Sequence, residues 1–167
     1  MKLSKPSSAS GAAALLALAA LISAGASAYG QQPSVERQLL LANQDCTTQS
    51  GAPEVYSAAS VASTCTSALA KLQAVAVVTS HDANVLHAMN VVARMAIATA
   101  YGTMDKARSR RSCDVAEQGW KDAAAINPQF SPAEVAGYLR DIIAKARAMV
   151  QVCRNDFGAG PGAAPLN

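Results

Sequence analysis

Apolar residues recur at spacings of three and four along most of the chain after residue 30, which is the pattern of amphipathic α-helices. The clearest example spans residues 132–153. Its apolar face comprises Val135, Tyr138, Leu139, Ile142, Ile143, Ala146, Met149, Val150 and Cys153. Ser131 can cap the start, Pro132 suits the first helical position and Glu134 completes a capping box. This segment is therefore predicted to be a helix.

A second seam of apolar residues starts just after Pro53 and Glu54 and predicts a helix over residues 55–72. The seam comprises Val55, Ala58, Ala62, Cys65, Leu69 and Leu72. Residues 75–78 have a strand-like composition, but no second run of this kind is present to pair with them. We therefore expect the helix to extend or fray there.

Residues 84–101 are apolar at almost every position and predict a central helix surrounded by neighbours. A narrow polar stripe interrupts this segment at His87, Asn90 and Arg94. Asp82 offers N-cap chemistry, and Gly102 is expected to end the helix.

Two further helices complete the prediction. One covers residues 34–47, with a stripe formed by Val35, Leu39, Ala42 and Cys46. The other starts near residues 103–105 and ends at Asn127 and Pro128. The residues that share one side of it are Ser109, Cys113, Ala116, Trp120, Ala123 and Ala124. Short connections favour antiparallel neighbours, so the sequence predicts an all-α fold of about five antiparallel helices.

The N-terminal segment has a different pattern. Lys2 and Lys5 precede an apolar stretch over residues 12–22, and Ala-Ser-Ala at 26–28 follows it. This arrangement is typical of a secretory signal peptide over residues 1–28. The apolar stretch is shorter than the roughly 20 residues of a spanning helix, so no membrane anchor is expected after cleavage. The protein is thus predicted to be exported, to the periplasm of a bacterium or beyond.

Removal of this segment changes the charge and leaves two regions. Lys2 and Lys5 are two of the 14 basic residues, so 12 remain against 11 acidic residues. A surface this close to neutral argues against nucleic acid as a partner.

Residues 29–157 are expected to form a single helical domain, whereas residues 158–167, rich in Gly, Ala and Pro, are expected to be disordered.

All four cysteines lie on predicted apolar faces, where they can bridge packed helices. Three pairings are possible for four cysteines. Cys46 and Cys65 flank one helical hairpin, and Cys113 and Cys153 lie on the last two helices. We therefore predict the disulfides Cys46–Cys65 and Cys113–Cys153. No C-x-x-C pair or C-x-x-C-H motif supports a redox, metal or haem role for these thiols.

The densest group of charges comprises Lys106, Arg108, Arg110 and Arg111. These residues form either a solvated helix face or a surface for an acidic partner or an anionic envelope component. Asp105 and Asp114 reduce the local positive field. Trp120 is a further candidate for partner binding if its side chain is exposed.

No residues point to catalysis, a metal or a cofactor. His81, Asp82 and His87 could be taken for a metal cluster, but helix capping and a polar stripe explain them. The two histidines match no nucleophile motif such as G-x-S-x-G. The sequence therefore does not predict an enzyme.

A partial resemblance to a known family lies in the pattern A-x-x-x-W-x-x-A-x-x-x-x-P, formed by Ala116, Trp120, Ala123 and Pro128. This pattern resembles the second helix of a tetratricopeptide repeat, and the resemblance covers at most residues 84–153. Tyr101 and Gly102 lie several residues too far upstream for a standard unit. The resemblance implies a short array of helical hairpins whose concave face binds a peptide or protein.

Two functions remain open on this basis. The first is a non-catalytic accessory or adaptor protein that contacts an unidentified protein partner in the cell envelope. The alternative is a small helical bundle that binds an apolar ligand. Its cavity would be lined by Met89, Met95, Met104, Trp120 and Tyr138.

Overall fold

The computed structural model describes the backbone of residues 33–127 and 133–166, and the side chains of residues 33–127 and 140–166. This part of the chain is all-helical, with no strand, and contains five helices as the sequence predicts. They are α2 (Val35–Ser50), α3 (Ala58–Gln73), α4 (Ser80–Met104), α5 (Arg110–Ala125) and α6 (Ala133–Phe157). The predicted signal peptide and the predicted capping box from Ser131 to Glu134 lie outside the described residues and side chains.

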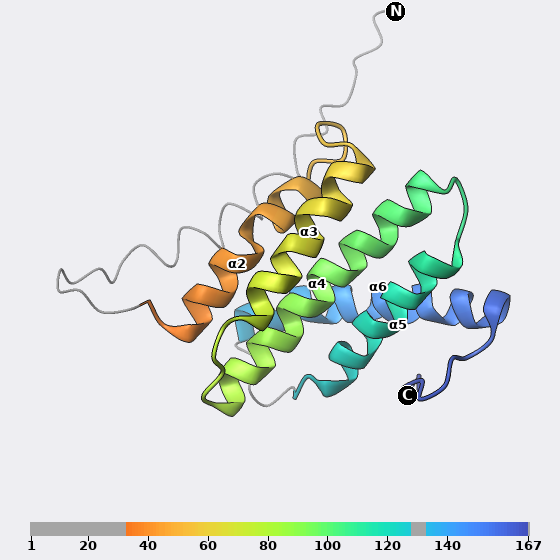
Figure 1. Ribbon diagram of the computed structural model, residues 1–167. Helices are drawn as coiled ribbons and strands as arrows, with labels where there is room; N and C mark the ends of the chain where they lie inside the picture. The colour runs from red at the N-terminus through yellow and green to blue at the C-terminus, as the bar shows by residue number, and fades with distance from the viewer. Residues whose placement is uncertain (1–32, 128–132, 167) are drawn as a thin grey trace, which may run out of the picture. The chain divides into compact units, whose positions relative to one another are not determined.

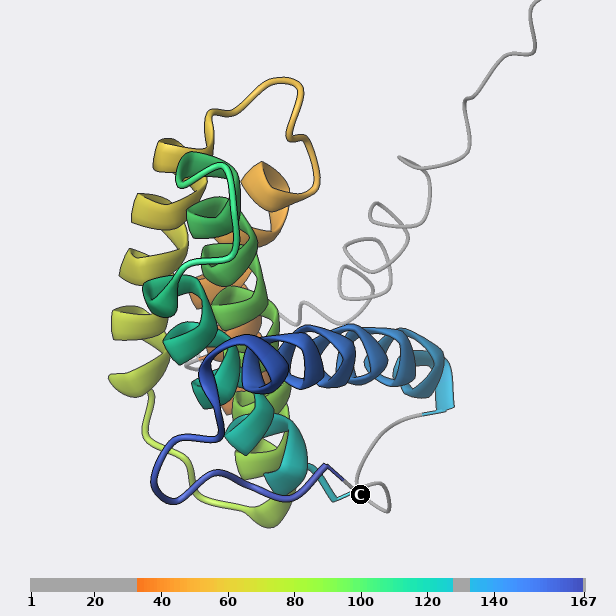
Figure 2. The same ribbon diagram turned by 90° about the vertical axis from the view of Figure 1, so that its right-hand side faces the viewer.

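The helices α2, α3, α4 and α5 lie side by side in alternating directions, as short connections favour (Figure 1). The last helix is different. Both views show α6 running across the other helices rather than parallel to them (Figure 2). It packs against α5 and, over a smaller area, against α4. The antiparallel arrangement predicted for all five helices therefore holds for α2–α5.

Serine and threonine side chains set the starts of the helices. Ser57 accepts a hydrogen bond from the backbone N–H of Ser60, so α3 begins at Ala58 rather than at residue 55. Val55 consequently lies in the preceding loop and is 68% exposed. The expectation that Val55 belongs to the apolar seam was wrong for this reason. Residues 75–78 form neither a strand nor an extension of α3, which ends at Gln73.

The central helix α4 is longer than predicted at both ends. Thr79 is its N-cap and forms a capping box with Asp82, and hydrogen bonds from Thr79 lower the pKa of the Asp82 carboxyl. At the other end the helix passes through Gly102 and stops only at Met104. The chain turns at Lys106, which has a positive φ of 54°. The predicted stop at Gly102 was therefore wrong.

The helix α5 begins at Arg110, later than predicted, because Ser109 caps it through the backbone N–H of Ser112. Residues 105–109 form the connection from α4 instead of the first turn of α5. Lys106 and Arg108 thus lie in a loop.

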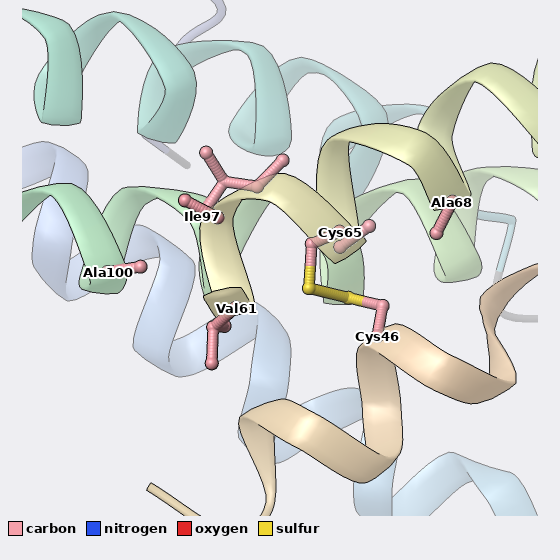
Figure 3. Packing of buried hydrophobic residues seen from close by; sticks show 8 residues of the cluster. Cys46, Val61, Cys65, Ala68, Ile97 and Ala100 are labelled. Carbon is pink, nitrogen blue, oxygen red and sulfur yellow. A yellow bond between two sulfur atoms is a disulfide. The ribbon is translucent and has the colours of Figure 1, made fainter. Parts of the chain in front are cut away.

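One half of the core lies between α2, α3 and α4. Figure 3 shows the Cys46–Cys65 disulfide at its centre, with Val61 and Ala68 of α3 and Ile97 of α4 around it. Most of these side chains are small, so the helices can approach closely. Leu72 is fully buried and adds about 2 kcal/mol of apolar burial.

The other half of the core lies between α4, α5 and α6. It comprises Val91, Met95, Ala98, Ala116, Trp120, Ala123, Ala146 and Val150. Gly119 permits the close contact of α5 with α4, since a Cβ there would lie 3.3 Å from Arg94 Cβ and 3.5 Å from Met95 Sδ. Ser112 is fully buried, and its hydroxyl donates to the Ala98 carbonyl at 2.7 Å. The helix α4 therefore contributes to both halves of the core.

Both predicted disulfides are confirmed. Cys46 is bonded to Cys65, and Cys113 is bonded to Cys153. The first closes the hairpin of α2 and α3, and the second joins α5 to α6, which crosses it. All four cysteines are at most 4% exposed.

The C-terminal segment differs from the expectation of disorder. Residues 158–166 turn back from the end of α6, and Ala164 and Leu166 pack against the core between α5 and α6. The segment consists mainly of Gly, Ala and Pro and has few large apolar side chains, but Ala164 and Leu166 meet a complementary surface. That surface could not be anticipated from composition alone.

Candidate functional site

The basic residues singled out in the sequence do not form one positively charged surface. Arg108 Nε donates to Asp156 Oδ2 at 2.7 Å. Arg111 forms a two-pronged ion pair with Asp105, and Arg111 holds the pKa of that carboxyl below its ordinary value through hydrogen bonding. Two carboxylates thus neutralise two of the four cations.

The other two basic positions lie in different surroundings. The Arg110 guanidinium lies 5.4 Å from the centroid of the Phe157 ring, at the end of α6. Lys106 is exposed in the turn after α4. Arg111 also contacts an aromatic ring, at 4.4 Å from the centroid of Tyr101. The two ring contacts join α5 to α4 and to α6.

Trp120 is 5% exposed and lies in the core between α4, α5 and α6. Its indole N–H donates to the Pro165 carbonyl at 3.0 Å. In this conformation Trp120 is therefore covered by the C-terminal segment and does not form part of the open surface.

The polar stripe of α4 converges on one carboxylate of α5. Asp122 Oδ1 lies 3.1 Å from His87 Nδ1 and accepts from Asn90 Nδ2 at 3.3 Å. Its other oxygen accepts from Arg94 Nε at 3.0 Å. Asp122 is only 15% exposed, so these donors replace water around the charge. The stripe is thus an interhelical polar contact rather than a solvated face.

This group joins α4 to α5 through one carboxylate. All four cysteines are in disulfides. His81, at the start of α4, lies 3.6 Å from Glu36 of α2. Across the described residues, no group of three His, Cys, Asp or Glu side chains could hold a metal ion.

An apolar groove among the described residues is a candidate binding site. Its volume is about 420 Å³, and it lies between the loop before α3 and the helices α3, α4 and α6. Apolar side chains including Val61, Val92 and Met95 form its floor, while Thr99, Asp141 and Lys145 lie among its polar lining. Sites for small apolar ligands fall in the range of about 300–1,000 Å³. The groove is therefore large enough for a ligand or for one side of a partner helix.

Of the residues predicted to line a ligand cavity, only Met95 lines this groove among those described. Met89 Sδ accepts from Asn43 Nδ2 at 3.6 Å, Met104 is 39% exposed, and Trp120 lies in the core described above. The side chain of Tyr138 is outside the described part. The sequence did not reveal Tyr56, Ala96 or Lys145 as lining residues.

Comparison with known proteins returns no match among protein families, curated proteins or solved structures. Separately, none of the described helices combines the length and apolar character required to cross a membrane. Inferences about function therefore depend on the geometry of this chain.

Proposed function

We propose that this chain is an exported, non-catalytic helical protein that binds another protein in the cell envelope through the groove between α3, α4 and α6. The observation that carries this proposal is the groove itself, which exposes a mainly apolar floor next to a charged rim. Apolar floors with polar rims are typical of protein interfaces. The signal-peptide pattern of residues 1–28 and two disulfides support an oxidising location.

The absence of a catalytic role is part of the same proposal. The polar residues that catalysis would need are used to hold helices together, as at Asp122 and in the pair formed by Arg154 and Glu117. The pattern at Ala116, Trp120 and Ala123, which resembles a tetratricopeptide repeat, also favours a role in protein binding.

Site-specific photocrosslinking tests this proposal. A photoreactive amino acid at Thr99, which is exposed in the groove, is expected to form one reproducible crosslinked species in intact envelopes. The same amino acid at Val78, which is 80% exposed and does not line the groove, serves as the control. Adding Ala96→Trp should remove the species formed from Thr99, since the indole would fill the groove. Identical crosslinks from both positions, or none from Thr99, would contradict the proposal.

The alternative function is the binding of a small apolar ligand in the same groove, which its volume favours. Native mass spectrometry of the protein purified from its natural compartment would then show a bound molecule of constant mass. Ala96→Trp should release that molecule while leaving the helical circular dichroism spectrum unchanged. A homogeneous mass equal to that of the polypeptide alone would exclude this alternative.

A further inference from the structure

Three consecutive carbonyl groups of the C-terminal segment each accept a hydrogen bond from a side chain of the helical domain. Arg154 Nη2 donates to the Ala164 carbonyl at 2.7 Å, Trp120 Nε1 to the Pro165 carbonyl at 3.0 Å, and Arg147 Nη2 to the Leu166 carbonyl at 2.6 Å. Because the acceptors are backbone groups, these contacts do not depend on which side chains the bound segment carries.

The side chains of the segment make a second, complementary set of contacts. Ala164 and Leu166 pack against the core between α5 and α6, whereas Pro165 between them is exposed. Two side chains that are two positions apart therefore face the helices, while the one between them faces solvent. The surface accepts a segment with small or aliphatic side chains at these two positions.

The donors are held in place by the helical domain itself. Arg154 forms a two-pronged pair with Glu117, at 2.6 and 2.9 Å, and this hydrogen bonding raises the pKa of Arg154. The guanidinium is thus fixed by α5 before it meets a carbonyl. Arg147 lies seven positions earlier on α6, about 10 Å along the helix axis. The two arginines and the indole therefore form a row, and the segment runs along it antiparallel to α6.

We propose that the row of Trp120, Arg147 and Arg154 is a peptide-binding site for an uncharged segment of a partner protein. In this structure residues 164–166 occupy the site, so the chain's own C-terminal segment competes with the partner. The recognised segment has the form small–x–aliphatic, as Ala164, Pro165 and Leu166 do. The site lies on a different face from the groove between α3, α4 and α6, and the inference holds whether or not that groove binds anything.

A peptide competition experiment on the full-length mature chain tests this inference. The probe is the capped peptide Gly-Pro-Gly-Ala-Ala-Pro-Leu, which repeats residues 160–166. Trp120 is the only tryptophan, so its fluorescence reports directly on the site. Leu166→Asp places a charge against the core and should expel the segment, which shifts the emission to longer wavelength. Added peptide should then bind and return the emission to shorter wavelength.

If the peptide competes with the C-terminal segment for the site, the peptide affinities of the variants should follow a definite order. The wild-type chain, whose site is occupied, should bind the peptide about tenfold or more weakly than the Leu166→Asp chain. Adding Arg147→Gln to Leu166→Asp should weaken peptide binding about tenfold, as expected for loss of a charged donor. Arg140→Gln, an exposed arginine of the same helix, is the matched control and should leave the affinity unchanged.

Four results would overturn the inference. The first is an unchanged emission on Leu166→Asp, which would mean that the segment is not held by these contacts. The second is a shifted emission without peptide binding, which would make the segment a structural part of the domain. The third is equal affinity for a peptide in which aspartate replaces leucine. The fourth is concentration-dependent dimerisation of the wild-type chain through exchanged C-terminal segments, which would assign the site to a second copy of the chain.

Discussion

At the scale of single residues, Asp122 is the common acceptor for three polar side chains of α4. His87, Asn90 and Arg94 of α4 all lie within 3.3 Å of its oxygens. Its position on α5 explains why α4 has a polar stripe in an otherwise apolar sequence. The stripe was visible from spacing alone, but its acceptor could not be predicted because it lies about 30 residues away in the chain.

Removing this acceptor should destabilise the fold. Asp122→Ala leaves the half-buried Arg94 guanidinium without its carboxylate, which we expect to lower the free energy of unfolding by about 2–3 kcal/mol. Urea unfolding followed by circular dichroism measures this change. Asp114→Ala, at an exposed position of α5, should alter the value by less than about 0.5 kcal/mol. Equal effects of the two substitutions would show that the contact with α4 does not stabilise the protein.

The role of Gly162 depends on its backbone conformation. The Gly160 carbonyl accepts from the Ala163 N–H at 3.2 Å, Pro161 follows Gly160, and Gly162 has a φ of 69°. These are the features of a type II turn, which needs glycine at its third position. The turn directs the C-terminal segment back along α6.

A pair of glycine substitutions separates backbone conformation from contact. Gly162→Ala forces a side chain into a left-handed conformation at a cost of about 1–2 kcal/mol, so it should partly release the segment and shift Trp120 emission to longer wavelength. Gly160→Ala has no positive φ, and a Cβ at either position meets nothing within 4 Å. Gly160→Ala is therefore the control and should leave the Trp120 emission unchanged. A shift of equal size in both variants would contradict this account of the turn.

At the scale of secondary-structure elements, each disulfide joins two consecutive helices, and the two bonds close loops of different length. The cysteines are 19 residues apart in the α2–α3 hairpin and 40 residues apart in the pair joining α5 to α6. Cross-links act mainly by restricting the unfolded chain, and the effect grows slowly with loop length. The chain-entropy estimate is about 3 kcal/mol for the shorter loop and about 4 kcal/mol for the longer one.

The two cross-links should therefore contribute unequally to stability. The double substitution of Cys113 and Cys153 by Ser is expected to lower the thermal midpoint more than that of Cys46 and Cys65. Differential scanning calorimetry of the two variants measures this difference. The thermal midpoint of the wild-type chain with both disulfides reduced gives the lower limit. Single Cys153→Ser should make Cys113 available to an alkylating reagent. Alkylation of Cys65 instead would contradict the observed pairing.

The elements themselves were largely predictable, and the errors have local causes. Spacing at three and four identified all five helices, because each must bury one face to be stable. The predicted starts of α3 and α5 were wrong because Ser57 and Ser109 are the N-caps of these helices. Each accepts one hydrogen bond through its side chain from the first turn. The stop at Gly102 failed because glycine ends a helix only where the chain adopts a left-handed turn, which here occurs at Lys106.

At the scale of the whole molecule, the proposed export makes a direct prediction about the mature N-terminus. Cleavage after Ala28 should leave Tyr29 as the first residue, which intact-mass measurement of the exported protein can verify. Ala28→Tyr should leave the precursor uncleaved, since the position before the cut requires a small residue. Ser27→Tyr, one position earlier, is the control and should be processed normally. Equal processing of both variants would contradict the predicted cleavage site.

The candidate binding surfaces depend on the whole molecule and were the least predictable part. The groove combines residues from Ser50 to Lys145, so no single segment contains a recognisable motif for it. The basic residues near α5 were visible as a cluster with Asp105 nearby, but Asp156 and Phe157 come from the distant end of α6 and could not be placed beside them from the sequence. The sequence Pro161-Gly162 is typical of a turn, but the high Gly, Ala and Pro content of residues 158–167 favoured disorder.

The pairing of the cysteines also bears on the order in which the protein can mature. Each cysteine is bonded to its immediate neighbour among the four along the chain, and neither bond crosses α4. A chain that enters an oxidising compartment N-terminus first would present Cys46 and Cys65 while the second half was still in transit. The first thiol would meet its correct partner before any wrong one had emerged, and the second pair would form with only two thiols left. Oxidation along such a route needs no reshuffling of bonds, so the native protein should form without the help of a disulfide isomerase.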